Sequence, residues 1–157
     1  MKAMLMAAAG LALALVSPAA AEPVYVSADR ALDVETGRYI ANPVIVIDDG
    51  RIVSVEVGGA IPADAERIDL TGMTLLPGLI DMHVHLDGRP EYGGYSNLQF
   101  SDRFWTVIAV ENARRMLNAG FTTIRNLGAD DYNVVGLDQA IEAGWVEGPR
   151  IVGAAHA

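Results

Sequence analysis

The stretch LLPGLIDMHVHLDG, residues 75–88, decides the fold because it is an apolar run that contains an aspartate and two histidines. Residues 75–86 have the composition of a strand in a parallel sheet that is covered on both sides. Because side chains of a strand alternate between its two faces, one face is wholly apolar and suited to packing under helices. That face carries Ile80, Met82, Val84 and Leu86, and the other carries Leu79, Asp81, His83 and His85.

The polar face predicts a metal site. Burying an aspartate and two histidines is costly unless something compensates for their lost hydration, and a metal ion would use all three. His83 and His85 are expected about 6.6 Å apart along the strand, which lets both imidazoles turn toward one ion such as zinc. Asp81, one pleat deeper, either ligates weakly or accepts the other ring proton of a histidine.

The remaining sequence is organised in two regimes. Residues 23–73 predict short strands separated by turns, with a hairpin at Asp49-Gly50 and another turn at Thr36-Gly37. From residue 74 onward the pattern is strand, helix, strand, helix, strand, with helices expected over residues 102–119 and 133–143. Both helical stretches end in Ala-Gly before a strand, as expected for successive βα units. The histidine pair then lies at the carboxyl end of a strand, where parallel β/α folds build their active sites.

The amino terminus has the features of a secretory signal peptide. Lys2 precedes an apolar run, and Ala19 and Ala21 fit the small-residue rule for cleavage before Glu22. The apolar run is shorter than the roughly 20 residues of a membrane span. We therefore expect residues 1–21 to be removed and the protein to be exported, periplasmic or secreted, without a membrane anchor.

Composition restricts the chemistry of the mature chain. Its ten arginines stand against 20 acidic residues, and the sequence contains no lysine other than Lys2. This balance argues against a nucleic-acid or anionic-membrane partner, because both require clustered positive charge. The sequence has no cysteine, so disulfides and thiolate metal sites are excluded and a metal needs His, Asp, Glu or modified groups.

The segment TLLPGLIDMHVHLDG, residues 74–88, resembles the first barrel strand of the amidohydrolase superfamily of metal-dependent hydrolases. The hairpin at residues 44–56 is similar to the small β-sandwich of that superfamily, and residues 120–129 and 148–157 resemble its second and third barrel strands. The resemblance implies an α/β fold, the amino-terminal part of a (β/α)8 TIM barrel preceded by a small β-sandwich segment. Its domains would be residues 1–21 as signal peptide, 22–73 as sandwich segment and 74–157 as the first three β/α units.

Within the superfamily, RNLGADD and GPRIVGAAHA resemble the exported branch near imidazolonepropionases and Xaa-Pro or Xaa-Arg dipeptidases. Members of that branch often have aspartate where this chain has Asn126. The resemblance implies that His83 and His85 are ligands of a divalent ion, usually zinc, with Asp81 as a supporting group. The complete proteins hold one or two such ions, which lower the pKa of a bound water and polarise the scissile carbonyl.

Other groups that the resemblance implies are a carboxylated lysine, two later histidines and a proton-shuttling aspartate, and these belong to strands four to eight. We expect none of them here, because a full barrel needs about 250 residues. The remaining histidine, His156, is interpreted as a loop residue in preference to a ligand. No catalytic residue is therefore assigned within this sequence, which is interpreted as an inactive amino-terminal fragment.

Two functions remain open at this point. The first is the amino-terminal portion of an exported amidohydrolase that cleaves C–N bonds of small substrates, namely dipeptides or N-acyl amino acids. The alternative is a truncated, non-catalytic exported protein with at most weak metal binding. In the long loop at residues 86–101, Arg89, Tyr92 and Tyr95 are either substrate contacts or solvated loop residues. The oligomeric state stays open.

Overall fold

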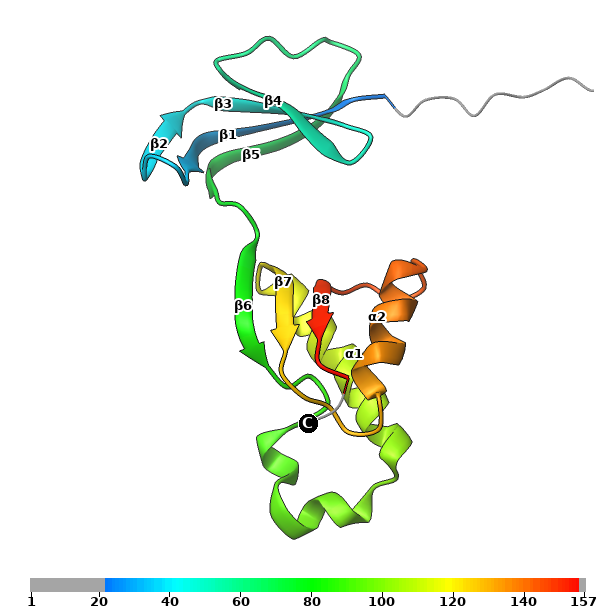
Figure 1. Ribbon diagram of the computed structural model, residues 1–157. Helices are drawn as coiled ribbons and strands as arrows, with labels where there is room; N and C mark the ends of the chain where they lie inside the picture. Colours follow the sequence, from blue (N-terminus) through cyan, green and yellow to red (C-terminus); the bar gives the residue numbers. More distant parts are fainter. Residues whose placement is uncertain (1–21, 156–157) are drawn as a thin grey trace, which may run out of the picture. The chain divides into compact units, whose positions relative to one another are not determined.

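The computed structural model describes residues 22–155, and within them the chain divides after Leu75 into two compact units (Figure 1). The predicted signal peptide, residues 1–21, and His156 lie outside the described residues. None of the helices in the part of the chain that the structure describes is long and apolar enough to cross a membrane.

The first unit is a five-stranded sheet. Its strands are β1 (Val24–Asp33), β2 (Arg38–Ala41), β3 (Pro43–Asp48), β4 (Arg51–Val57) and β5 (Glu66–Leu75). Along one edge of β1 lie β3 and then β2, both antiparallel, and β5 pairs in parallel with β1. The predicted hairpin is confirmed, because β3 and β4 are joined by Asp49 and Gly50, which have φ angles of 46° and 69°. Two successive positive φ values give the turn a twist that matches the strands, and glycine adopts them without strain.

The strand expected over residues 75–86 is divided in the structure. Leu75 ends β5 of the first unit, and β6 (Leu79–Val84) begins the second. Pro77 lies in the break, where its missing N–H cannot take part in a sheet. Gly78 follows it, and a Cβ there would collide with the side chain of Thr122. The prediction was therefore wrong about continuity, because composition alone does not show where a strand changes sheet.

The second unit is a parallel sheet of three strands, β6, β7 (Phe121–Asn126) and β8 (Arg150–Gly153), in that order. Between β6 and β7 come the short helices η1 (Pro90–Tyr92) and η2 (Gly94–Gln99) and the long helix α1 (Asp102–Asn118). Helix α2 (Asn133–Glu142) connects β7 to β8. Figure 1 shows α1 and α2 on the same side of these strands. The strand–helix alternation from residue 79 onward is thus as predicted, within one residue at each helix end.

A compact apolar core joins the two helices to the sheet. Ala109 and Ala113 of α1 are fully buried, and their small side chains let the helix approach Ile124 of β7 closely. Val134 and Leu137 of α2 complete the contact. Gly120 and Gly144 end the two helices with φ angles of 95° and 74°, the left-handed conformation that the Ala-Gly pairs predicted.

The apolar face of β6 is only partly covered. Val84 and Leu86 pack in or against the core, as expected, but Ile80 and Met82 are 61% and 59% exposed. The prediction that all four lie under helices was wrong for these two. The cause is the position of β6 at the edge of the sheet, where α1 and α2 cover its neighbours and only the carboxyl end of β6 itself.

Asp138 is a polar residue in the contact between α2 and β8. Burial raises the pKa of its carboxyl, the like charge of Glu142 raises it further, and a hydrogen bond from the backbone of Ile151 partly opposes both. Since the pKa is higher in the folded chain than in the unfolded one, ionisation of Asp138 destabilises the fold. This cost is fully present above the folded-state pKa, shrinks as the pH falls below it, and is lost well below pH 4, where the carboxyl is protonated in both states.

We expect Asp138→Asn to raise the free energy of unfolding at pH 7 by up to about 1 kcal/mol, because the amide oxygen still accepts the Ile151 N–H but carries no charge. The gain in the free energy of unfolding, measured by urea denaturation, should be smaller at pH 4 than at pH 7. Asp64→Asn, at an exposed position of the first unit, is the matched control. A gain that is equal at both pH values would contradict the prediction.

Candidate metal centre

His83 and His85 are brought together at the carboxyl end of β6. His83 is the penultimate residue of the strand, and His85 is the first residue after it. Their ring centroids are 5.5 Å apart with the ring planes at 66°, and both side chains are exposed. The two imidazoles therefore lie next to each other, as the alternation of the strand predicts, at the end of the parallel sheet.

Asp81 lies on the same strand but contacts the backbone. Its Oδ1 accepts a hydrogen bond of 3.0 Å from the N–H of His83. The ring of His85 has another partner, because its Nδ1 lies 3.2 Å from the carbonyl oxygen of Gly128. One of the two roles expected of Asp81 was to orient a histidine ring by a hydrogen bond. At His85 that contact is made by a backbone carbonyl of the loop after β7.

The donors present fit part of a metal site. His83 and His85 are neighbours, and one ring nitrogen of His85 already makes a hydrogen bond. Histidine ligands of metals usually have such a hydrogen bond on the ring nitrogen that does not bind the ion. Within residues 22–155, however, no group of three or more His, Cys, Asp or Glu side chains is placed to hold an ion. A protein zinc site normally uses three or four protein ligands, so His83 and His85 supply about half of a set.

Two side-chain amides, the buried Asn126 and the half-buried Asn112, connect the loops around these histidines. Asn126 is fully buried, accepts the N–H of Leu86 on Oδ1 at 2.8 Å, and donates from Nδ2 to the Gly128 carbonyl at 2.8 Å. Asn112 of α1 donates to the carbonyls of Leu86 and Gly88 at 2.7 and 3.1 Å. Sequence reasoning noted Asn126 only as a departure from the family pattern. The signal that could have identified it is an amide at the last position of a parallel strand, next to the loops that build the site.

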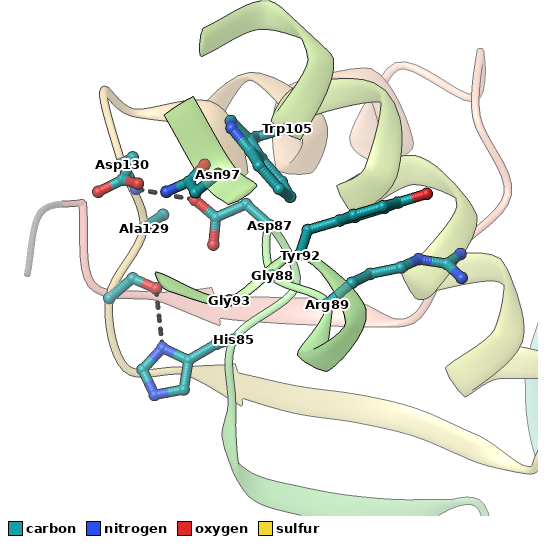
Figure 2. Close-up of a pocket in the computed structure, with 11 residues that line it drawn as sticks. His85, Asp87, Gly88, Arg89, Tyr92, Gly93, Asn97, Trp105, Ala129 and Asp130 are labelled. Carbon is teal, nitrogen blue, oxygen red and sulfur yellow. Dashed lines mark hydrogen bonds between the residues drawn. The ribbon is translucent and has the colours of Figure 1, made fainter. Parts of the chain in front are cut away.

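A pocket of about 290 Å³ lies beside His85. Figure 2 shows its polar side, where Asp87 accepts the backbone N–H of Asp130 at 2.8 Å and Asn97 lies close by. Trp105 and Tyr92 form an aromatic side. The carboxyl ends of β6 and β7 thus share one cavity, because the loops that follow both strands line it.

The loop after β6 is folded back on α1 by aromatic contacts. Phe100 and Phe104 stack with centroids 4.2 Å apart, and Tyr92 and Trp105 meet them edge-on or tilted at 5.0 to 6.0 Å. Of the three loop residues considered from sequence, Arg89 and Tyr92 line the pocket, whereas Tyr95 is 91% exposed. Phe104 and Trp105 of α1 pack in this aromatic cluster, where Trp105 also forms a pocket wall.

Comparison with known proteins shows the class to which this site belongs. A model of the amidohydrolase family matches residues 74–156, which include both helices, all three parallel strands and the histidine pair. The chain belongs to the amidohydrolase family. Members of this family are hydrolases that typically bind divalent metals, in agreement with the resemblance deduced from the histidine strand.

Individual relatives agree with that membership. The chain is 46% identical over 43 residues to a dihydroorotase of Syntrophus aciditrophicus (strain SB), a match that covers 27% of this chain and 10% of the relative. It is 41% identical over 54 residues to an imidazolonepropionase of Saccharopolyspora erythraea, covering 34% of this chain and 14% of the relative. The similarity to imidazolonepropionases was expected from the sequence, and the one to dihydroorotases was not.

Among solved structures, a Xaa-Pro dipeptidase with methionine bound in its active site superposes with a TM-score of 0.78 at 28% identity. The match covers 86% of this chain and 34% of the dipeptidase chain. The present sequence therefore spans about a third of that protein, and the matched segments span a tenth to a seventh of the two curated relatives. The mixed α/β fold and the family are shown.

Proposed function

We propose that residues 22–157 are the amino-terminal part of an exported, metal-dependent amidohydrolase that cleaves amide or peptide C–N bonds of dipeptides or N-acyl amino acids. The observation that carries the proposal is the pair of imidazoles, His83 and His85, with ring centroids 5.5 Å apart at the end of β6 and a pocket beside them. Membership of the amidohydrolase family and the similarity to a Xaa-Pro dipeptidase support it.

In this proposal His83 and His85 hold a divalent ion, and imidazole ligands favour zinc. When bound, such an ion lowers the pKa of a water molecule and polarises the carbonyl that is to be cleaved. The chain's own contribution is to hold the ligands in place. The Gly128 carbonyl binds Nδ1 of His85, and Asp81 fixes the backbone N–H of His83.

The pocket beside His85 is the proposed substrate site. Its volume of about 290 Å³ suits part of a small substrate, at the lower end of the range for ligand pockets. Tyr92 and Trp105 offer apolar surface, and Asp87 and Asn97 offer hydrogen-bonding groups. A dipeptide, which combines apolar side chains with polar backbone groups, matches that mixture. The likeness to a solved Xaa-Pro dipeptidase, which extends over 86% of the chain at 28% identity, supports the dipeptide class.

A second candidate is a non-catalytic exported protein that binds metal weakly. The observation in its favour is the shortage of ligands, because the described residues contain no group of three or more potential metal-binding side chains. The nucleotide sequence after the codon for Ala157 would separate the two. A continuing frame that supplies further histidines and a lysine supports the enzyme, and a stop codon there supports the second candidate.

In a chain extended through the remaining barrel strands, His83→Ala and His85→Ala should each lower zinc content and dipeptide hydrolysis together, because each removes one ligand of the same ion. We expect at least a 100-fold loss of activity, in line with removal of a group that binds the metal directly. Elemental analysis and a hydrolysis assay on one preparation measure both. His156→Ala is the matched control, and full metal content in the His83→Ala, His85→Ala double variant would refute the assignment.

Residues 22–157 expressed alone should show no metal-dependent hydrolysis, because two imidazoles leave an ion short of ligands and no proton-shuttling group is assigned in them. The segment should also aggregate more readily than the extended chain, since Ile80 and Met82 are exposed and, among residues 22–155, β6 pairs with a strand on one edge alone. The measurement compares turnover with added zinc, and light scattering, for both chains. Turnover by the segment near that of the extended chain would contradict the proposal.

The export proposal predicts that the mature protein begins at Glu22, because Ala19 and Ala21 form the cleavage signal. Amino-terminal sequencing of the protein recovered outside the cytoplasm measures this directly. Replacing Ala21 by a bulky residue such as leucine should leave the leader uncleaved. Recovery of exported protein that still begins at Met1 would refute cleavage.

A further inference from the structure

The side chain of Asn126 joins the loops after β6 and β7 at a point where neither loop bonds the other through regular sheet pairing. Its Oδ1 accepts the N–H of Leu86 at 2.8 Å, and its Nδ2 donates to the carbonyl of Gly128 at 2.8 Å. The same carbonyl lies 3.2 Å from Nδ1 of His85, the contact drawn as a dashed line at His85 in Figure 2. One carbonyl oxygen therefore meets a buried amide and the imidazole ring.

The donors and acceptors of this chain of contacts can be assigned in only one way. The N–H of Leu86 is a donor, so the amide atom of Asn126 that faces it must be the oxygen. The NH₂ group then faces Gly128 and donates to its carbonyl. Because a carbonyl only accepts, Nδ1 of His85 must carry the proton in the contact at 3.2 Å. In the neutral ring this leaves Nε2 with the free lone pair.

We propose that Asn126 is a positioning residue for His85: by holding the Gly128 carbonyl, it fixes the Nδ1–H tautomer and makes Nε2 the metal-binding atom. The inference rests on the proposed function for the role of His85 as a ligand. The two lone pairs of the Gly128 carbonyl are both used, one by the amide and one by the imidazole, so the position of the oxygen is fixed from two directions. The two hydrogen bonds of the Asn126 side chain are shielded from water, because Asn126 has no exposed surface.

A purely structural Asn126 would stabilise the loops without influencing the ring. The two roles are separated by Asn126→Leu, because leucine keeps the bulk of the side chain but removes both hydrogen bonds of the amide. A structural role would lower stability alone, whereas a positioning role would also release the Gly128 carbonyl and with it the ring of His85. The control is Thr106→Val, which removes the 2.6 Å hydrogen bond from Thr106 to Asn133 in the same unit without touching either loop carbonyl.

The test uses the extended chain labelled with ¹⁵N-histidine, free of metal and at a pH where the rings are neutral. Long-range ¹H–¹⁵N spectra distinguish a protonated Nδ1 from a protonated Nε2, and His85→Ala assigns the signals. We expect Nδ1–H at His85 in the wild type and in Thr106→Val, and a mixture of tautomers in Asn126→Leu. Titration with Co²⁺, followed by visible absorption, should show affinity 10- to 100-fold lower in Asn126→Leu only.

The outcomes separate this inference from the proposed function. Nε2–H at His85 in the wild type overturns the inference without any variant, even if Asn126→Leu fails to fold. An unchanged tautomer and Co²⁺ affinity in a folded Asn126→Leu also overturn it, while leaving the metal site intact. If the tautomers change as expected but Co²⁺ binding does not depend on His83 or His85, the proposed function fails and the positioning of the ring stands.

Discussion

The carbonyl of Gly128 accepts hydrogen bonds from the buried amide of Asn126 and from the ring of His85, and the geometry of the candidate site depends on it. Parallel strands are held together along their length by the sheet, but the loops beyond their carboxyl ends have no such ladder. Asn126 supplies one connection between them, since its oxygen holds Leu86 after β6 while its nitrogen holds Gly128 after β7. The hydrogen bond from the Asp130 N–H to Asp87 is a second connection between these loops.

The energetic importance of this connection follows from burial. A net hydrogen bond contributes only about 1 kcal/mol, but leaving a buried donor or acceptor without a partner costs about 1–3 kcal/mol. Asn126 is fully buried and Leu86 nearly so, at 2% exposure, and the Asn126 amide engages the Leu86 N–H and the Gly128 carbonyl. The cost of a wrong arrangement therefore exceeds the gain from any single bond. Because arrangements that leave these buried groups without partners are costly, the two loops adopt the arrangement in which the groups are paired. That arrangement also fixes the orientation of the His85 ring.

Much of the second unit could be predicted from sequence because its signals are local. The strand alternation brought His83 and His85 together, and the Ala-Gly pairs marked both helix ends to within a residue. The break between β5 and β6 was missed, because Leu75 and Leu79 look alike by composition and only the sheet pairing separates them. The role of Gly128 could not be predicted either, since any residue has a carbonyl. Contacts of that kind depend on how two loops meet, and residues 85 and 128 are far apart in the sequence.

Three features of β6 support the proposal that this unit is part of a larger barrel. Among the described residues β6 pairs only with β7, so its other edge has no strand beside it. Ile80 and Met82 are more than half exposed on its apolar face, although burying such a side chain stabilises a protein by about 1.5–3 kcal/mol. Its polar face offers two imidazoles and no third ligand within residues 22–155. In a closed (β/α)8 barrel, a neighbouring strand would pair with the other edge of β6 and a neighbouring helix would cover Ile80 and Met82. The remaining barrel strands would also bring further ligands to the two histidines, so a closed barrel accounts for all three features.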